Sequence, residues 1–120
     1  MPSSLDPVVP TDAHAQQAVE TFKLLTDPTR VKVLWVLHQG ERSVGDLAKR
    51  VGASPTAVSQ HLAKLRLAGL VTTRREGTYV YYSAHSAHVQ QLLAEALSHA
   101  EHTTGTRGER HLYTADPAAD

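Results

Sequence analysis

Histidine is the residue with the clearest chemical potential in this sequence, because eight histidines and no cysteine occur in 120 residues. The lack of thiols excludes disulfides, cysteine nucleophiles and thiolate metal sites, so any metal ion must be held by nitrogen and oxygen. Half of the histidines gather at or in the last segment with helical apolar periodicity, and they are His85, His88, His99 and His102.

The spacing of these four histidines predicts two half-sites for a metal ion. His85 and His88 are three residues apart, as are His99 and His102, so each pair can project from one side of a helix. Eleven residues separate His88 from His99, which is about 16 Å along a helix and too far for one ion. Two such helices packed antiparallel about a twofold axis would form two equivalent sites. The sequence therefore predicts a metal site that requires a homodimer.

The elements that must position these residues follow from helix caps and from the spacing of apolar residues. Asp27-Pro28 and Ser54-Pro55 each combine a capping side chain with a proline suited to the first helical position. We expect a flexible arm at 1–12, helices at 13–25, 28–39, 43–51, 54–68 and 86–102, a hairpin over 70–83 with its tip at Glu76-Gly77, and a mobile tail at 103–120. The expected fold is mainly α with a β-hairpin (α+β), as one dimeric winged helix-turn-helix domain over 13–102.

Helices 43–51 and 54–68 are joined by a tight turn that contains glycine, which predicts a helix-turn-helix. The second helix would enter a major groove of DNA, because its outward side chains are nearly all hydrogen-bond donors or acceptors. Ser59, Gln60 and His61 are the expected base contacts, with Thr56 and Lys64 beside them. Arg74 and Arg75 flank the hairpin tip and are expected to meet phosphate or an adjacent minor groove.

The charge distribution supports double-stranded DNA as the partner. The formal net charge is zero, but residues 28–75 carry nine bases and two acids while both flanking segments are acidic. No apolar run could span a bilayer and no secretion signal opens the chain, so the protein is expected to be cytoplasmic without a membrane partner. His99-Ala-Glu-His102 falls one residue short of a His-x-x-Glu-His protease motif, so we expect neither an enzyme nor a small-molecule substrate.

Three runs of residues carry a resemblance to a known family: Leu-Leu-Thr-Asp-Pro-Thr-Arg at 24–30, Ser-Pro-Thr-Ala-Val-Ser-Gln-His-Leu at 54–62 and Leu-Ala-Gly-Leu-Val at 67–71. Together they resemble the ArsR/SmtB family of metal-responsive repressors, and the similarity covers about residues 14–102. The resemblance implies a dimer with the first and last helices at its interface. It also implies that the dimer binds an operator when it is free of metal and leaves it when metal binds.

The family's last-helix metal site has Asp-x-His near the helix start and His-x-x-His or His-x-x-Glu near its end. Here Ser86-Ala87-His88 and His99-Ala100-Glu101-His102 occupy those positions, and Ser86 replaces the aspartate usual in zinc sensors. The extra donors His85, Glu101 and the tail residue His111 favour octahedral nickel or cobalt over zinc, which remains the alternative. The chain is similar in this to the family's nickel- and cobalt-responsive subgroup. The family's other metal site, built on cysteines in the helix at 43–51, is absent.

Two further interpretations stay open at this point. The protein could be a winged-helix transcription factor that is independent of metal or controlled by a protein partner, with incidental histidines. It could also be a dimerisation module whose polar helix binds protein. Metal binding separates the first from a metal sensor, and salt-sensitive DNA binding separates the second from any transcription factor.

Overall fold

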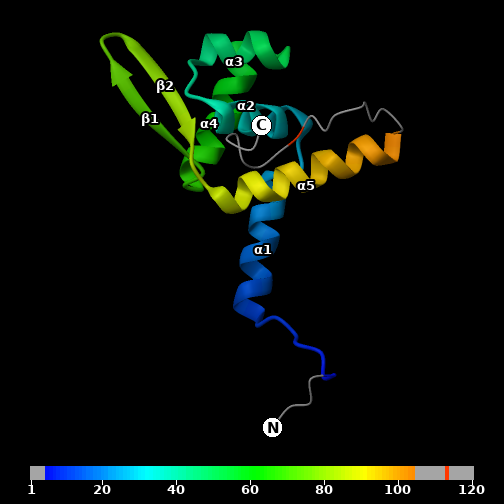
Figure 1. Ribbon diagram of the computed structural model, residues 1–120. Coiled ribbons are helices and arrows are strands. Elements are labelled where there is room, and N and C mark those ends of the chain that lie inside the picture. Colours follow the sequence, from blue (N-terminus) through cyan, green and yellow to red (C-terminus); the bar gives the residue numbers. More distant parts are fainter. Residues whose placement is uncertain (1–4, 105–112, 114–120) are drawn as a thin grey trace.

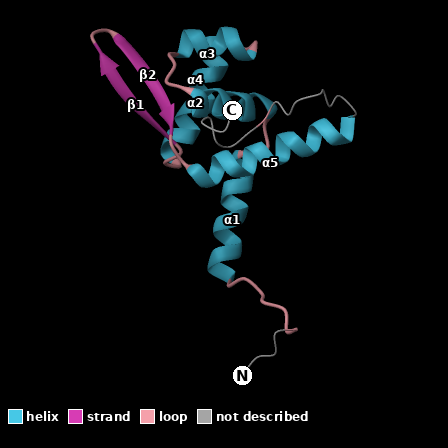
Figure 2. Ribbon diagram, in the orientation of Figure 1, coloured by secondary structure: helices cyan, strands magenta, loops and turns pink. Residues whose placement is uncertain are grey.

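A computed structural model describes residues 5–104 and 113, and it confirms the expected fold class. Within these residues, five helices and one antiparallel hairpin form a winged helix-turn-helix (Figures 1 and 2). Among the described residues no helix is long and apolar enough to cross a membrane. The elements are α1 (Asp12–Leu24), α2 (Pro28–Gln39), α3 (Val44–Val51), α4 (Pro55–Leu67), β1 (Val71–Glu76), β2 (Tyr79–Ala84) and α5 (Ala87–Thr104).

Side-chain caps fix where the central helices begin. The side chains of Asp27, Ser43 and Ser54 each accept a hydrogen bond from the backbone N–H three residues further on. This satisfies one of the N–H groups that lack a partner within the helix. The turn between α3 and α4 is closed by Gly52, whose φ of +69° suits a residue without a Cβ.

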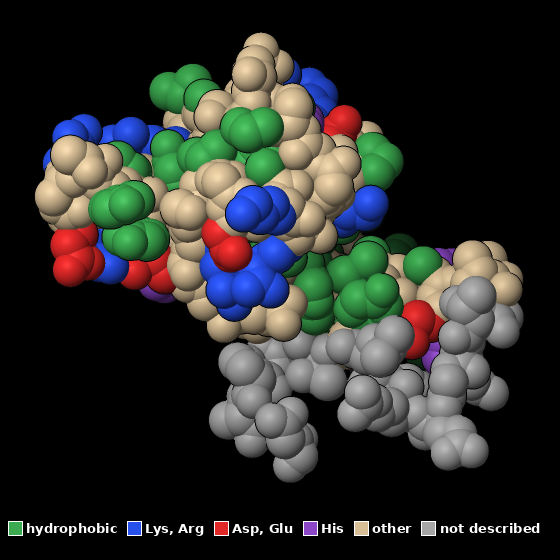
Figure 3. Space-filling model, turned by 90° about the horizontal axis from the view of Figure 1, so that it is seen from above, with side chains coloured by type: hydrophobic (Ala, Val, Ile, Leu, Met, Phe, Trp, Pro, Cys, Tyr) green, Lys and Arg blue, Asp and Glu red, His purple; other side chains and the backbone are tan. Residues whose placement is uncertain are grey.

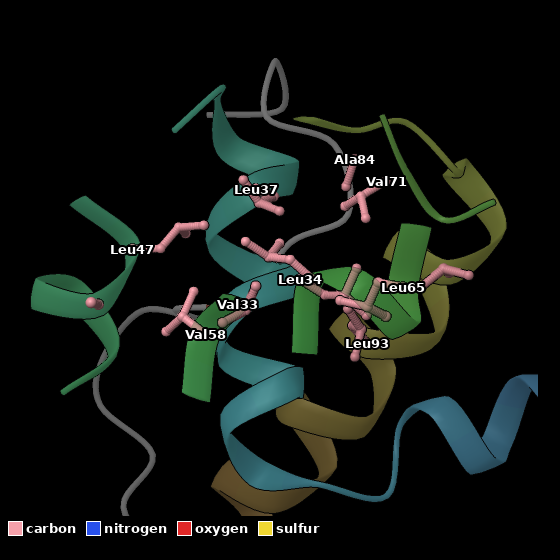
Figure 4. Close-up of a cluster of buried hydrophobic side chains, with 12 residues drawn as sticks. Val33, Leu34, Leu37, Leu47, Val58, Leu65, Val71, Ala84 and Leu93 are labelled. Atoms are coloured by element: carbon pink, nitrogen blue, oxygen red, sulfur yellow. The ribbon is translucent and has the colours of Figure 1, made fainter. Parts of the chain in front are cut away.

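The hydrophobic core is centred on α2, and side chains from three other helices and the base of the hairpin converge on it (Figure 4). Val33 and Leu34 of α2 are completely buried, as are Leu47 of α3 and Leu65 of α4. The α5 residues Val89 and Leu93, together with Val71 and Ala84 at the base of the hairpin, complete the same cluster. A shift of α5 against α2 would therefore change the packing of α4, because one close-packed core joins all three helices.

The hairpin turn lies one residue later in the chain than expected. The sequence predicts the tip at Glu76-Gly77, but Glu76 pairs with Tyr79 and the two-residue turn is Gly77-Thr78. Gly77 has a φ of +61°, and Thr78 does not share that positive sign. A glycine first, followed by an ordinary residue, is the pattern of a type II′ turn, which matches the twist of the flanking strands.

Helix α1 projects away from the rest of the chain (Figure 1). None of its residues is buried, and Val19 and Phe22 remain 46% and 54% exposed. The sequence predicts an amphipathic helix here, so its apolar stripe is present but is not covered by the described part of the same chain. Beyond α5, Tyr113 packs edge-on against Trp35 of α2, with ring centroids 5.7 Å apart.

Candidate DNA-binding and metal-binding surfaces

Helix α4 has a buried apolar face and an exposed polar face. Val58, Leu62 and Leu65 point into the core, while the predicted DNA contacts Thr56, Ser59, Gln60 and Lys64 are all exposed. The exposed side chains offer two hydroxyls, an amide and one ammonium group, which can read base edges and hold phosphate. The fold therefore brings four of the five residues predicted on this helix to one accessible surface.

His61 is the exception on this helix. Its side chain is only 18% exposed, and its Nε2 lies 3.3 Å from Oδ2 of Asp27. The same oxygen of Asp27 accepts the N–H of Arg30 at the start of α2. The structure thus holds His61 against the neighbouring helix, which differs from the sequence-based expectation of an outward base contact. The pair lies too far apart in sequence for spacing to reveal it.

The acid stability of the protein should depend on Asp27. The hydrogen bond from the Arg30 N–H lowers the pKa of Asp27, and the nearby His61 contributes in the same direction. A lowered folded pKa means that the stabilisation is complete above the unfolded value of 3.8 and is lost as pH falls through the folded pKa. The Asp27→Asn substitution keeps the cap but removes the titration. Urea unfolding should show that the advantage of wild type over the variant, complete at about pH 7, shrinks as the pH falls below 3.8.

A gap between the two proteins that stays constant over that pH range would contradict the assignment. The matched control is Asp12→Asn, because Asp12 lies in the first turn of α1 and is exposed. That substitution leaves the cap of α1 intact, since the capping oxygen there belongs to Thr11.

The two hairpin arginines differ in their surroundings. Arg74 donates from Nη2 to Oε1 of Glu41 at 2.7 Å and from Nη1 to Oε2 of Glu76 at 2.8 Å. Its guanidinium also lies over the Tyr81 ring, 4.9 Å from the centroid. Arg75 forms no ion pair with any residue in the described ranges 5–104 and 113. Of the two arginines predicted to meet DNA, Arg74 is therefore paired with carboxylates, and Arg75 has no such partner among the described residues.

Glu101 is the unusual residue among the predicted metal ligands. His88, His99 and His102 are exposed along α5, whereas Glu101 is 5% exposed. Both carboxylate oxygens are shielded from water, and neither has a hydrogen-bond partner among the described residues. A shielded carboxylate without a partner is costly, and coordination to a cation is one way in which proteins compensate it. The donor set here therefore fits a divalent ion held by imidazole and carboxylate.

The start of α5 differs from the expected half-site. Ser86 caps the helix, with its Oγ accepting the N–H of Val89 at 3.2 Å, so His85 precedes the helix and cannot pair with His88 by helical spacing. His85 lies instead near His38: burial is the main cause that lowers the pKa of His38, and the charge of His85 lowers it further. The other predicted ligand outside α5, His111, lies outside the described residues.

The described part of one chain does not assemble a metal site by itself. Within residues 5–104 and 113, no three histidine, aspartate or glutamate side chains lie close enough to hold one ion. The two ends of α5 are separated along the helix as the sequence analysis expected. A site that uses both ends therefore needs donors from a second chain or from the tail.

Comparison with known proteins places the chain in a family. The model of the bacterial regulatory protein, arsR family, matches residues 27–73, which span the start of α2 to β1. The HTH-type transcriptional regulator NmtR of Mycobacterium tuberculosis is 40% identical over 106 residues, covering 88% of each chain. The protein belongs to the ArsR family.

Other relatives agree with this assignment. The HTH-type transcriptional regulator KmtR of Mycobacterium tuberculosis is 54% identical over 84 residues, which are 70% of this chain and 65% of KmtR. The solution structure of the homodimeric winged helix-turn-helix DNA-binding domain of Mb0332 from Mycobacterium bovis superposes with a TM-score of 0.67 at 31% identity. It covers 88% of this chain and all of that domain. The ArsR-family chain is accordingly a DNA-binding transcriptional regulator and not an enzyme.

Sequence reasoning missed several residues that shape these surfaces in the ArsR-family chain. Glu41 holds Arg74, Asp27 holds His61, and Ser86, which the sequence analysis treats only as a replacement for the family's aspartate, caps α5. Ser86 carried a readable signal, because a serine immediately before an apolar-periodic run is a typical N-cap. The other two pairings join residues that are distant in sequence, and only the fold brings them together.

Proposed function

We propose that the chain is a metal-responsive regulator that binds operator DNA as a homodimer in the cytoplasm and is released by nickel or cobalt. The observation that carries the proposal is the buried Glu101 carboxylate, which lies without a hydrogen-bond partner among the described residues, next to exposed His102. A bound divalent ion would give the negative charge of this carboxylate a positively charged partner. The proposed ligands are His88, His99, Glu101 and His102, with His85 and the tail residue His111 as further candidates.

The choice of metal rests on the chemistry of the donors. The chain has no cysteine, and imidazole with carboxylate is a donor set that nickel and cobalt accept readily. Position 86 is a serine, so it offers no carboxylate for a closed tetrahedral zinc site. The Ser86 hydroxyl instead accepts the N–H of Val89 and caps α5. Zinc is the alternative metal, and the experiment below includes it.

The proposal needs two chains, and α1 supports this. Its apolar residues Val19 and Phe22 are about half exposed although the helix is amphipathic, and a related domain is described as homodimeric. Antiparallel packing of two α5 helices would place His88 of one protomer beside the end of the other helix. Each of the two sites would then draw donors from both protomers.

The proposed operator surface consists of the exposed residues of α4 and Arg75 of the hairpin, which forms no ion pair within the part of the chain that the structure describes. Gln60 and Ser59 would contact base edges, while Thr56, Lys64 and Arg75 would contact phosphate or neighbouring groups. This surface is supported by their exposure on one face of a helix whose other face forms the core. Arg74 is left out of the set because it is already held by two carboxylates.

A mechanical connection joins the two surfaces. Val89 and Leu93 of α5 pack into the same core as Leu34 of α2 and Leu65 of α4. Donors gathered around one ion would fix the two α5 helices in one arrangement and thereby change the spacing of the two α4 helices. Such a coupling is reciprocal: operator must weaken metal binding by the factor by which metal weakens operator binding.

The test is fluorescence anisotropy of a labelled duplex taken from the DNA upstream of the chain's own gene, titrated with protein and then with nickel, cobalt or zinc. We expect release by nickel or cobalt, with operator affinity lowered by about 5- to 150-fold. Metal affinity measured with and without the duplex should differ by the same factor. Equal metal affinity in both cases would refute metal control, and release by zinc alone would select the alternative metal.

A further inference from the structure

The hairpin carries different chemistry on its two faces. In the antiparallel register Arg74 lies opposite Tyr81, and Arg75 lies opposite Val80. Because side chains alternate between the faces of a strand, the two neighbouring arginines point to opposite sides. Figure 3 shows the result at the projecting hairpin, with basic side chains along one side and acidic side chains gathered along the other.

On the face with Arg74, the arginine is paired with Glu41, which lies in the loop between α2 and α3. The guanidinium of Arg74 engages both oxygens of Glu41, with Nη2–Oε1 at 2.7 Å and Nε–Oε2 at 3.0 Å. Glu76 takes a third donor at 2.8 Å, and the Tyr81 ring lies beneath the group. Bidentate pairs of this kind have a fixed geometry and are stronger than single contacts at a surface.

The backbone repeats this connection. Arg42, the neighbour of Glu41, exchanges two backbone hydrogen bonds with Tyr82: the Arg42 N–H donates to the Tyr82 carbonyl at 3.1 Å, and the Tyr82 N–H donates to the Arg42 carbonyl at 2.8 Å. The loop therefore acts as a short third strand along β2, and Ser83 Oγ lies 3.5 Å from Oε2 of Glu41. Through this contact the wing is tied to the loop that begins the helix-turn-helix.

The face with Arg75 continues the inner face of the hairpin. Val71 and Ala84 are buried on that face at its base, where β1 also contacts α4. Arg75 lies four register pairs further out and faces the same side, is exposed, and forms no ion pair within the described ranges. Its charge is thus available on the side of the hairpin that faces α4 at its base.

We propose that Arg74 is a positioning residue that Glu41 uses to hold the wing, and that Arg75 alone makes the wing's phosphate contact. The inference rests on the proposed DNA-binding function. Arg74 is paired with the carboxylates of Glu41 and Glu76, so these three side chains together carry a net negative charge and do not attract a phosphate. Arg75 adds one uncompensated positive charge per protomer, and it should release counterions when DNA binds.

The experiment compares Arg74→Gln with Arg75→Gln, two neighbouring substitutions with the same change of charge. Binding of each dimer to a random-sequence duplex is measured over a range of salt concentrations. Arg75→Gln should reduce the slope of log K against log salt by about 0.9 per protomer. Arg74→Gln should leave that slope unchanged. Equal reductions in both variants would overturn the division of roles.

A second measurement, made without DNA, reports on the wing itself. Hydrogen exchange at the amides of Arg42 and Tyr82 should accelerate in Arg74→Gln and in Glu41→Gln, because both substitutions remove the side-chain tie beside those hydrogen bonds. Arg75→Gln should leave exchange there as in wild type. Unchanged exchange in all three variants would overturn the positioning role of Arg74.

The two measurements also separate this inference from the proposed function. A wild-type chain that binds no DNA would overturn the phosphate contact of Arg75 together with the DNA-binding function. The exchange rates would still decide whether Arg74 positions the wing. Normal DNA binding in which both arginines contribute equally to the salt slope would overturn the inference alone.

Discussion

Replacing Glu101 with glutamine is expected to abolish the release of operator DNA by nickel or cobalt while DNA binding itself persists. Glutamine has nearly the same shape as glutamate but lacks its charge, and Glu101 lies on α5, whereas the predicted base contacts lie on α4. The shift in operator affinity on adding metal should fall from about 5- to 150-fold to about onefold. Anisotropy titrations with and without metal measure both quantities in one preparation.

A urea unfolding measurement and a control variant test whether this result is specific to Glu101. Without metal the variant should unfold at higher urea concentration than wild type, because the substitution removes a buried charge that lacks a partner among the described residues. Glu95→Gln is the matched control, since Glu95 is exposed on the same helix and accepts a hydrogen bond from Gln91 at 3.2 Å. A Glu101→Gln dimer that still leaves DNA on adding nickel or cobalt would remove Glu101 from the ligand set.

Replacing Gln60 with alanine should produce the largest loss of operator recognition. An amide that reads a base with two hydrogen bonds contributes about 1–3 kcal/mol, so two protomers would lose about 2–6 kcal/mol of operator affinity. Binding to a random-sequence duplex should change little, because that binding depends on phosphate contacts. Competition between the operator duplex and the random duplex measures the difference directly.

Gln39→Ala provides the control for this second experiment. Gln39 is an exposed glutamine at the end of α2, and its Nε2 donates to the carbonyl of Trp35. It does not belong to α4, so it is not part of the proposed operator surface. This control should retain the full preference for operator DNA. If Gln60→Ala lowered affinity for both duplexes equally, Gln60 would hold the backbone and some other residue would read the bases.

The element order could be predicted because its signals are local. Asp27 and Ser54 each act as a cap and precede a proline in the first turn, and these signals act over only a few residues. The hairpin was predicted with its turn one residue early, because Glu76-Gly77 and Gly77-Thr78 both contain the required glycine. Only strand pairing decides which of the two dipeptides forms the turn.

The surfaces were less predictable, since pairing between distant residues decides which side chains stay available. His61 and Arg74 have the right chemistry for DNA, and nothing close to them in sequence indicates that Asp27 and Glu41 engage them. The burial of Glu101 is likewise a property of the packed chain. Its neighbours in the sequence, Ala100 and His102, are both exposed.

The cap at the start of α5 has a consequence for how an ion would act. Ser86 supplies the acceptor for the first turn from within the chain, so this end of the helix is preorganised by its own side chain. The free energy of coordination would then not be consumed in ordering that turn. That free energy would remain available to favour one orientation of the two preformed α5 helices over another, which is what a rapid and reversible switch requires.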